Sequence, residues 1–305
     1  SVTGVQTLLF RSVASNIAAE IACIDIKENV AYGEALDICH SISSPINRNI
    51  KVYSGGFDTV KDADVIICDA GPSILPGQYE RLKLAKENVK NITEIMTEVV
   101  KYNTDAIFIM ITNPLDVTTY LAATKFGWKH GRLFGTGTTL ETLRFKYILS
   151  RHFGVNPQDI QGYMLGEHGN SAFPAWSTVS IGGIRLNDLH NYFPEVKLDR
   201  ELIHKQVVKT AYEVMDAKGW TNTGIASGAI RLAQAVFFDE KTVVPVSVPL
   251  TGEYGLKDVA LSLPSVVGKD GVEKRLALPL PEDELELLYK SSECIKEVLR
   301  ASNLI

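Results

Sequence analysis

The chain has 305 residues, of which 45% are hydrophobic and 22% charged, and its formal net charge is -5. These proportions are those of a globular protein large enough for two domains. An acidic balance without a basic cluster argues against a nucleic-acid partner. No apolar run reaches the roughly 18 residues that a membrane span needs, so we expect a cytoplasmic protein with a small-molecule partner and no membrane contact.

The cysteines lie far apart in the chain and form no C-x-x-C pair; they are Cys23, Cys39, Cys68 and Cys294. Without such spacing we expect reduced, packed thiols rather than a disulfide framework or a zinc site. The sequence therefore predicts no metal.

The first expected elements are a helix over residues 5–18 and a short apolar strand over residues 21–25 that ends in Asp25. A helix and then a buried strand closing on an acid is typical of a dinucleotide-binding βαβ unit, in which the carboxylate accepts hydrogen bonds from a ribose. The alternative is an aspartate that only caps the next helix. Both interpretations stay open on this pattern alone.

Amphipathic helices and apolar strands continue to alternate up to residue 111. We expect a helix over 30–39, strands over 51–53 and 65–68, a helix over 82–99 and a strand over 106–111. This alternation predicts an α/β fold with a doubly wound parallel sheet and ligands at the carboxyl ends of its strands. Asp25, Gly71 and Asn113 each follow such a strand and are expected to converge on one crevice.

From residue 136 the pattern changes to that of a second, α+β domain. A helix over 136–153 carries Glu141 and Arg144 on one face, and a strand over 159–165 leads into a Gly-rich turn with His168. Further helices are expected over 199–218, 224–238 and 281–299, with β runs over 243–250, 259–267 and 274–280. We divide the chain into a dinucleotide-binding (Rossmann) domain, residues 1–135, and a substrate domain, residues 136–305.

His168 is the strongest catalytic candidate in the sequence. Glycines on either side let the backbone turn tightly and approach a ligand, and imidazole is the side chain whose ordinary pKa lies near neutrality. The turn therefore suits a group that takes up and releases a proton. The alternative is a histidine that merely caps a loop.

Several motifs then occur in a familiar order: TNPLD at 112–116, GTGTTLETLR at 135–144, GEHGNS at 166–171, KGWTNTGIA at 218–226 and PVSVPLTGEYG at 245–255. In order and spacing they resemble the L-lactate and malate dehydrogenase family of NAD-dependent 2-hydroxy-acid dehydrogenases. The resemblance runs from about Asn16 to the C-terminus. It implies an oxidoreductase that uses NAD and acts on a 2-oxo or 2-hydroxy acid.

The resemblance also implies roles for four side chains. His168 would be the acid/base that gives a proton to the carbonyl oxygen, and Glu141 would orient its ring. Arg144 would bind the substrate carboxylate through two parallel hydrogen bonds. Arg81 would polarise the carbonyl as the preceding loop closes. For each arginine the alternative is a surface ion pair.

Further positions follow from the same resemblance. Asn113 and Thr221 would line the substrate pocket, and Asn113 would also lie at the nicotinamide side of the cofactor. Gly71 and Asn88 are further cofactor-binding candidates. Asp25 would bind the ribose of NAD and favour it over NADP, because its charge would repel a 2′-phosphate.

The N-terminal region departs from the family. The expected first strand and its G-x-G-x-x-G turn are missing or altered, and Gly4 is the only glycine near the expected place. Residue 1 is Ser rather than Met, so we expect that upstream residues belong to the natural protein. NAD binding is the part of the site that this departure affects most.

Glu141 stands where the family usually has Asp. The additional methylene moves the carboxylate by about 1.5 Å. A misplacement of that order costs up to about a hundredfold in rate. We therefore expect either reduced activity or a compensating shift of the helix.

Ile74 occupies the loop position that distinguishes the branches of the family, and no basic residue lies between Gly71 and Arg81. The second carboxylate of oxaloacetate would then lack a countercharge, which disfavours malate. An apolar side chain here suits larger hydrophobic 2-oxo acids, as in the L-2-hydroxyisocaproate dehydrogenase branch. Alignment shifted by one would place Ser73 or Leu75 here, with the same exclusion of malate.

We therefore expect an L-2-hydroxy-acid dehydrogenase, with L-lactate and pyruvate as the default substrates. The alternatives are the isocaproate-type enzyme and a catalytically silent relative that serves as a binding or structural protein. The resemblance implies a homo-oligomer, tetramer or dimer. Lys146 and Gln161 stand where the family's fructose 1,6-bisphosphate site has Arg and His, so we predict weak or absent activation.

Overall fold

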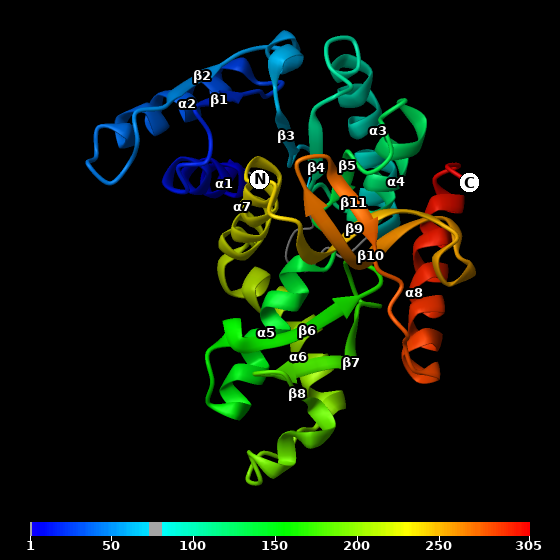
Figure 1. Cartoon of the computed structure of the whole chain (residues 1–305). Helices are drawn as coiled ribbons and strands as arrows, with labels where there is room; N and C mark the ends of the chain where they lie inside the picture. The colour runs from blue at the N-terminus through cyan, green and yellow to red at the C-terminus, as the bar shows by residue number, and fades with distance from the viewer. Residues whose placement is uncertain (1, 73–80) are drawn as a thin grey trace.

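The computed structural model describes residues 2–72 and 81–305, apart from the side chains of residues 2–5 and 81. Two bodies are visible in Figure 1: sheets with their helices in the upper part, and α5, α6 and β6–β8 below. No helix in the described ranges combines the length and apolar character that a bilayer crossing requires.

The N-terminal segment forms a small unit of two helices and two strands. Helix α1 (Val2–Ala14) precedes β1 (Glu20–Cys23), and α2 (Glu28–Ile42) connects β1 to β2 (Lys51–Ser54). The strands pair in parallel, from Glu20 with Lys51 to Cys23 with Ser54. Alanines and branched aliphatic residues of α2, β1 and β2 form the core of this unit.

The main sheet has six strands in the order β11-β10-β9-β5-β4-β3. Its parallel part consists of β3 (Val65–Cys68), β4 (Ile107–Met110) and β5 (Leu133–Gly135). Its antiparallel part consists of β9 (Thr242–Thr251), β10 (Lys257–Gly268) and β11 (Gly271–Arg275).

The sequence analysis expected a parallel sheet in the first half of the chain and assigned the later β runs to the second domain, but in the structure these runs extend the same sheet. The later β runs join the sheet edge beside β5, through the pair Gly135 and Ser247. Hairpin connections make β9, β10 and β11 antiparallel to one another, which short Gly turns allow and a crossover helix does not.

Helices cover both faces of the parallel strands. Neighbouring side chains of a strand point to opposite faces, so each face of β4 has its own partners. Phe108 and Met110 of β4 pack with α3 (Arg81–Val99) and α4 (Leu115–Lys125). Ile107 and Ile109 pack on the other side with α7 (Thr223–Phe237). A strand that is apolar throughout is therefore buried on both sides, as expected of a doubly wound sheet.

The second body contains α5 (Thr139–Phe153), β6 (Ile160–Leu165), β7 (Phe173–Ile181), β8 (Ile184–Arg185) and α6 (Arg200–Lys218). Strands β6–β8 form an antiparallel sheet, and α5 and α6 share its apolar core. The final helix α8 (Glu282–Ala301) packs on β10. Short 3-10 turns occur at Phe57–Asp62, Pro157–Asp159, Leu186–Asn191 and Glu253–Gly255.

Hydrogen bonds from β10 and β6 tie the two bodies together at the start of α5. The backbone N of Thr138 donates to Oγ of Ser262 at 2.9 Å, and Oγ1 of Thr138 donates to O of Met164 at 2.6 Å. Ser262 also exchanges backbone hydrogen bonds with Gly166 at 2.8 and 3.2 Å. The beginning of α5 and the end of β6 are therefore held in a fixed relation.

Gly137 should be intolerant of substitution, because it lies at the crossing of these segments. It has φ +55°, and an added Cβ would lie 2.5 Å from Oγ of Ser262 and 2.6 Å from N of Ser247. We expect Gly137→Ala to lower the free energy of unfolding by about 3 kcal/mol, from strain and overpacking together. Urea denaturation measures this.

Gly154→Ala is the matched control. Gly154 has a similar φ of +65° but no heavy atom within 4 Å of the added Cβ. Its cost should stay near about 1 kcal/mol, the price of the left-handed conformation alone. Equal losses in the two variants would contradict the packing argument.

Candidate active site

A cavity of about 290 Å³ lies where β3 and β4 end. It is lined by the segments that follow these strands, by α5, by residues 168–170, and by α6 and the start of α7. His168, Glu141, Arg144, Asn113, Thr221 and Gly71 all line it. Residues from both halves of the sequence thus meet at the carboxyl ends of the parallel strands, where open α/β sheets bind their ligands.

His168 lies in the turn after β6, between Gly166 and Gly169. Gly166 has φ +87°, and a Cβ there would lie 2.5 Å from Oγ of Ser291, so the turn requires glycine. The imidazole is mostly buried, with 18% of the side chain exposed, and its Nδ1 lies 2.9 Å from Oε1 of Glu141. The other ring nitrogen, Nε2, is the one left for a substrate.

Glu141 and Arg144 share one face of α5, as their spacing predicts. Glu141 is in the first turn of the helix, where the helix dipole favours a negative charge. Nη1 of Arg144 lies 3.8 Å from the same Oε1 that contacts His168. The longer side chain of Glu141 therefore still reaches the imidazole at hydrogen-bond distance, so the structure shows the carboxylate in contact with His168 despite the extra methylene.

The surroundings of His168 favour its protonated form. Burial by itself lowers the pKa of the imidazole, but the negative charge of Glu141 and its contact with Nδ1 outweigh this effect. The negative charge of Asp116 also raises the pKa, and the positive charge of Arg144 lowers it. The net pKa of His168 is raised. For Glu141, burial opposes ionisation, while His168 and Arg144 favour it, and the net pKa of the carboxyl is lowered.

Arg144 supplies positive charge inside the cavity. Its side chain is 13% exposed. Burial lowers the pKa of the guanidinium and Glu141 acts in the opposite direction. Among the described residues that line the cavity, Arg144 is the only arginine or lysine. The cavity therefore matches a ligand with one carboxylate near Arg144 and a hydrogen-bond acceptor near His168.

The cofactor candidates Gly71 and Asn113 line the cavity, whereas Asn88 supports them from behind. Nδ2 of Asn88 donates to O of Pro72 at 2.9 Å and to O of Asn113 at 2.6 Å. Gly71 has φ +115°, and a Cβ there would lie 2.3 Å from Oδ1 of Asn88. Asn88 is fully buried on α3, so in this structure it holds the two strand-end loops in place.

Three other predicted site residues lie elsewhere or outside the described part. Asp25 is exposed just after β1, where its Oδ1 accepts from N of Lys27 at 2.8 Å, and it does not line the cavity. Ile74 lies outside the described residues. Arg81 begins α3, and its side chain lies outside the described part of the structure as well.

Two residues that line the cavity, Asp69 and Tyr212, were not predicted from the sequence. Asp69 follows β3, and burial raises the pKa of its carboxyl to about 6. Tyr212 on α6 donates from its hydroxyl to Oδ1 of Asn170 at 2.7 Å, linking α6 to the turn with His168. An acid directly after an apolar strand was a detectable signal for Asp69, as it was for Asp25. Nothing local marks Tyr212.

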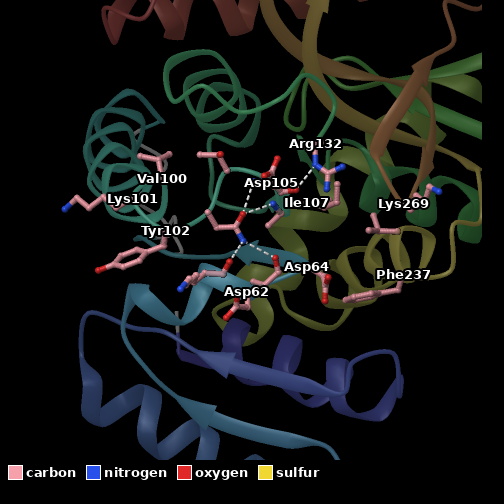
Figure 2. A pocket seen from close by; sticks show the side chains of 16 residues that line it. Asp62, Asp64, Val100, Lys101, Tyr102, Asp105, Ile107, Arg132, Phe237 and Lys269 are labelled. Atoms are coloured by element: carbon pink, nitrogen blue, oxygen red, sulfur yellow. Dashed lines mark hydrogen bonds between the residues drawn. The ribbon is translucent and has the colours of Figure 1, made fainter.

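A larger cavity of about 740 Å³ lies at the opposite, amino ends of β3–β5 (Figure 2). Two of its polar side chains, those of Arg132 and Asn103, hydrogen-bond to neighbouring segments of the chain. Arg132 donates from Nε to O of Asp105 at 2.7 Å and from Nη1 to Asp270 at 3.1 Å. Nδ2 of Asn103 donates to the carbonyls of Val60, Lys61 and Ala63 at 2.8 to 3.2 Å. These contacts organise the amino ends of the strands and offer no acid/base pair.

No group of three His, Cys, Asp or Glu side chains within residues 2–72 and 81–305 could hold a metal ion. The described cysteines are free thiols, and burial raises the pKa of Cys23 and of Cys68 to about 11. Both thiols are therefore un-ionised near neutral pH.

Comparison with known proteins gives a consistent family assignment. Residues 1–135 match the lactate/malate dehydrogenase NAD binding domain, and residues 138–303 match the lactate/malate dehydrogenase alpha/beta C-terminal domain. An L-lactate dehydrogenase of Selenomonas ruminantium is 46% identical over 93% of this chain and 90% of its own length. L-lactate dehydrogenase 2 of Clostridium acetobutylicum is 41% identical over 98% of this chain and 94% of its own length.

A solved structure agrees. The crystal structure of a lactate dehydrogenase from a Medee basin deep-sea metagenome library has a TM-score of 0.93 and 30% sequence identity. It covers 99% of this chain, and this similarity covers 96% of that structure.

We expect Glu141→Gln to lower the pKa of His168, because burial remains while the opposing negative charge is lost. The pH titration of ¹³C-labelled histidine rings measures this, and His168→Gln assigns the resonance. Glu141→Asp keeps the charge and should keep the raised pKa. An unchanged titration in Glu141→Gln would show that Glu141 does not set the protonation of His168.

Proposed function

Because the chain belongs to the lactate/malate dehydrogenase family, we propose that it interconverts an L-2-hydroxy monocarboxylic acid and its 2-oxo acid with NAD, and that L-lactate and pyruvate are its substrates. The observation that carries this proposal is the buried contact of 2.9 Å between His168 and Glu141, with Arg144 beside it in one cavity.

The chemistry of the proposed reaction assigns a task to each side chain. Arg144 binds the substrate carboxylate, which places the carbonyl oxygen toward Nε2 of His168. Protonated His168 donates its proton to that oxygen during reduction and takes it back during oxidation. Glu141 keeps the other ring nitrogen protonated and stabilises the imidazolium. Arg81 would add a second positive charge at the carbonyl oxygen.

NAD, when bound, supplies or accepts the hydride at the carbonyl carbon. The strand-end loops suit this cofactor, because Gly71 and Asn113 line the cavity at the carboxyl ends of β3 and β4. We propose that Gly71 and Asn113 hold its nicotinamide half, and that Asn88 acts through both loops. The carboxylate of Asp25 would bind the ribose and favour NAD over NADP.

A further strand is proposed between β1 and β3. Within the described residues, β1 pairs with β2 and β3 pairs with β4, and no ladder joins the two pairs. In Figure 1 the pair β1–β2 stands apart from the main sheet, on the side of β3. A parallel strand in this place would join the two sheets, and its following turn would supply the backbone N–H groups that bind a pyrophosphate.

The cavity favours a monocarboxylate over a dicarboxylate. With Arg144 as the only Arg or Lys among the described lining residues, a second carboxylate would be buried without a countercharge. Val208, Ala211 and Met215 of α6 add an apolar wall. This wall and Ile74 support the alternative of larger hydrophobic 2-oxo acids, as in isocaproate-type enzymes.

Assembly, location and regulation remain predictions. We propose a homo-oligomer, dimer or tetramer, which fits the exposed apolar side chains of Tyr32 and Leu36 on α2 and of Leu143 and Tyr147 on α5. A cytoplasmic location is proposed as well. Activation by fructose 1,6-bisphosphate is expected to be weak or absent, because Gln161 carries no charge and Lys146 is left as the one cation at the two matching positions.

NADH oxidation with pyruvate, 2-oxoisocaproate, phenylpyruvate and oxaloacetate tests the proposal. We expect turnover of the monocarboxylates and a much smaller kcat/KM with oxaloacetate. The assay uses the chain as printed and a variant with an added N-terminal strand and G-x-G-x-x-G turn, in which tighter NADH binding is expected. No turnover and no NADH binding in either form would favour the catalytically silent relative.

Ile74→Arg should shift the preference toward oxaloacetate. A countercharge for the second carboxylate is worth about 2 kcal/mol, or roughly thirtyfold in the ratio of kcat/KM for oxaloacetate to that for pyruvate. Leu75→Arg is the control for the alignment. A larger shift in Leu75→Arg would place the specificity position at residue 75.

A further inference from the structure

A second buried carboxylate contacts the turn that carries His168. Asp116 lies in the first turn of α4 and is 2% exposed. Its Oδ2 accepts a hydrogen bond from the backbone N of His168 at 2.7 Å, and its Oδ1 accepts from Oγ of Ser247 at 2.6 Å. Asp116 thereby joins α4, the catalytic turn and β9, which are far apart in the sequence.

The position of Asp116 has an energetic consequence. A buried carboxylate is costly unless hydrogen bonds or a positive charge compensate for lost hydration. The two donors, the N–H of His168 and the hydroxyl of Ser247, supply such hydrogen bonds. Ser247 on β9 is itself fully buried, so the carboxylate has little freedom to turn away from the catalytic turn.

The charges around His168 come from several elements. Glu141 and Arg144 on α5 and Asp116 on α4 each act on the imidazole, the two acids favouring its positive charge and the arginine opposing it. Asp69, after β3, and Tyr212, on α6, line the same cavity. Glu167, next to His168, accepts a hydrogen bond at Oε2 from Oγ of Ser171. Asp116 is thus the acid on the backbone side of the turn, whereas Glu141 is the acid on the ring side.

We propose that Asp116 is a positioning residue for the reaction: it fixes the backbone of His168 and stabilises the imidazolium from the backbone side of the turn. The inference rests on the proposed role of His168 as acid/base. Asp116 does not line the cavity, and it acts through His168 and through its hydrogen bond with Ser247.

Asp116→Asn separates the charge from the scaffold. The amide oxygen of Asn can still accept from N of His168, and its NH₂ group can donate to Oγ of Ser247. The negative charge alone is lost, so the proton on His168 is held less tightly. For pyruvate reduction, which needs protonated His168, we expect the alkaline limb of kcat/KM to move down by about one pH unit, a roughly tenfold loss above the limb. Histidine ¹³C titration should show the same shift.

Ser247→Ala makes the complementary change. It keeps the charge of Asp116 but removes one of its anchors, so we expect a fall in kcat of about threefold with the alkaline limb in place. An unmoved limb and an unmoved histidine titration in Asp116→Asn would overturn the proposal. Should Asp116→Asn fail to fold, Ser247→Ala decides, and an unchanged kcat there overturns the positioning role.

Glu284→Gln is the matched control. Glu284 is likewise buried, at 4% exposure, and accepts from N and Oγ of Ser177 at 2.8 and 2.5 Å, but it does not line the cavity. It should leave the pH profile in place, and a shift equal to that of Asp116→Asn would overturn the proposal. His168→Asn distinguishes a failure of the proposed function from a failure of the inference about Asp116. If His168→Asn still reduces pyruvate, the acid/base role of His168 is wrong. If it does not, and the pH profile of Asp116→Asn is unchanged, only the positioning role of Asp116 is wrong.

Discussion

The buried contact between His168 and Glu141 is the constraint on which the site depends. Burying either charged group alone would be unfavourable, because loss of hydration opposes the charged form of both. Placed 2.9 Å apart, each stabilises the charge of the other. Such a pair is favourable only where its partners cannot move apart, so the surrounding fold has to fix the start of α5 against the end of β6.

The fold meets this requirement through backbone and hydroxyl contacts. Ser262 of β10 binds both Thr138, before α5, and Gly166, before His168. Thr142 of α5 accepts from N of Met164 in β6 at 2.9 Å. Because these contacts involve buried strands, α5 and the catalytic turn cannot shift independently. The antiparallel strands that the sequence analysis placed in a separate domain thus hold the site together.

The direction of the strands explains why the cavity lies at one end of the sheet. The carboxyl ends of β3 and β4 lead into short loops whose backbone is open to ligands, at Gly71 and Asn113. At the amino ends, Asn103 and Arg132 bind carbonyl groups of neighbouring segments, and Figure 2 shows Arg132 beside Asp105. The candidate active site therefore lies at the carboxyl ends of the parallel strands, and structural contacts occupy their amino ends, although the larger cavity lies at the amino ends.

Local pattern alone determined much of this protein. The apolar run of β3 and the helical spacing of apolar residues in α3 located these elements to within a residue. The spacing of three residues between Glu141 and Arg144 placed both on one face of α5. His168 was found because glycines flank a group with a pKa near neutrality. Tertiary structure decided the rest, since contacts across many residues leave no local pattern: β9 beside β5, Asn88 behind the strand-end loops, and Asp116 against the backbone of His168.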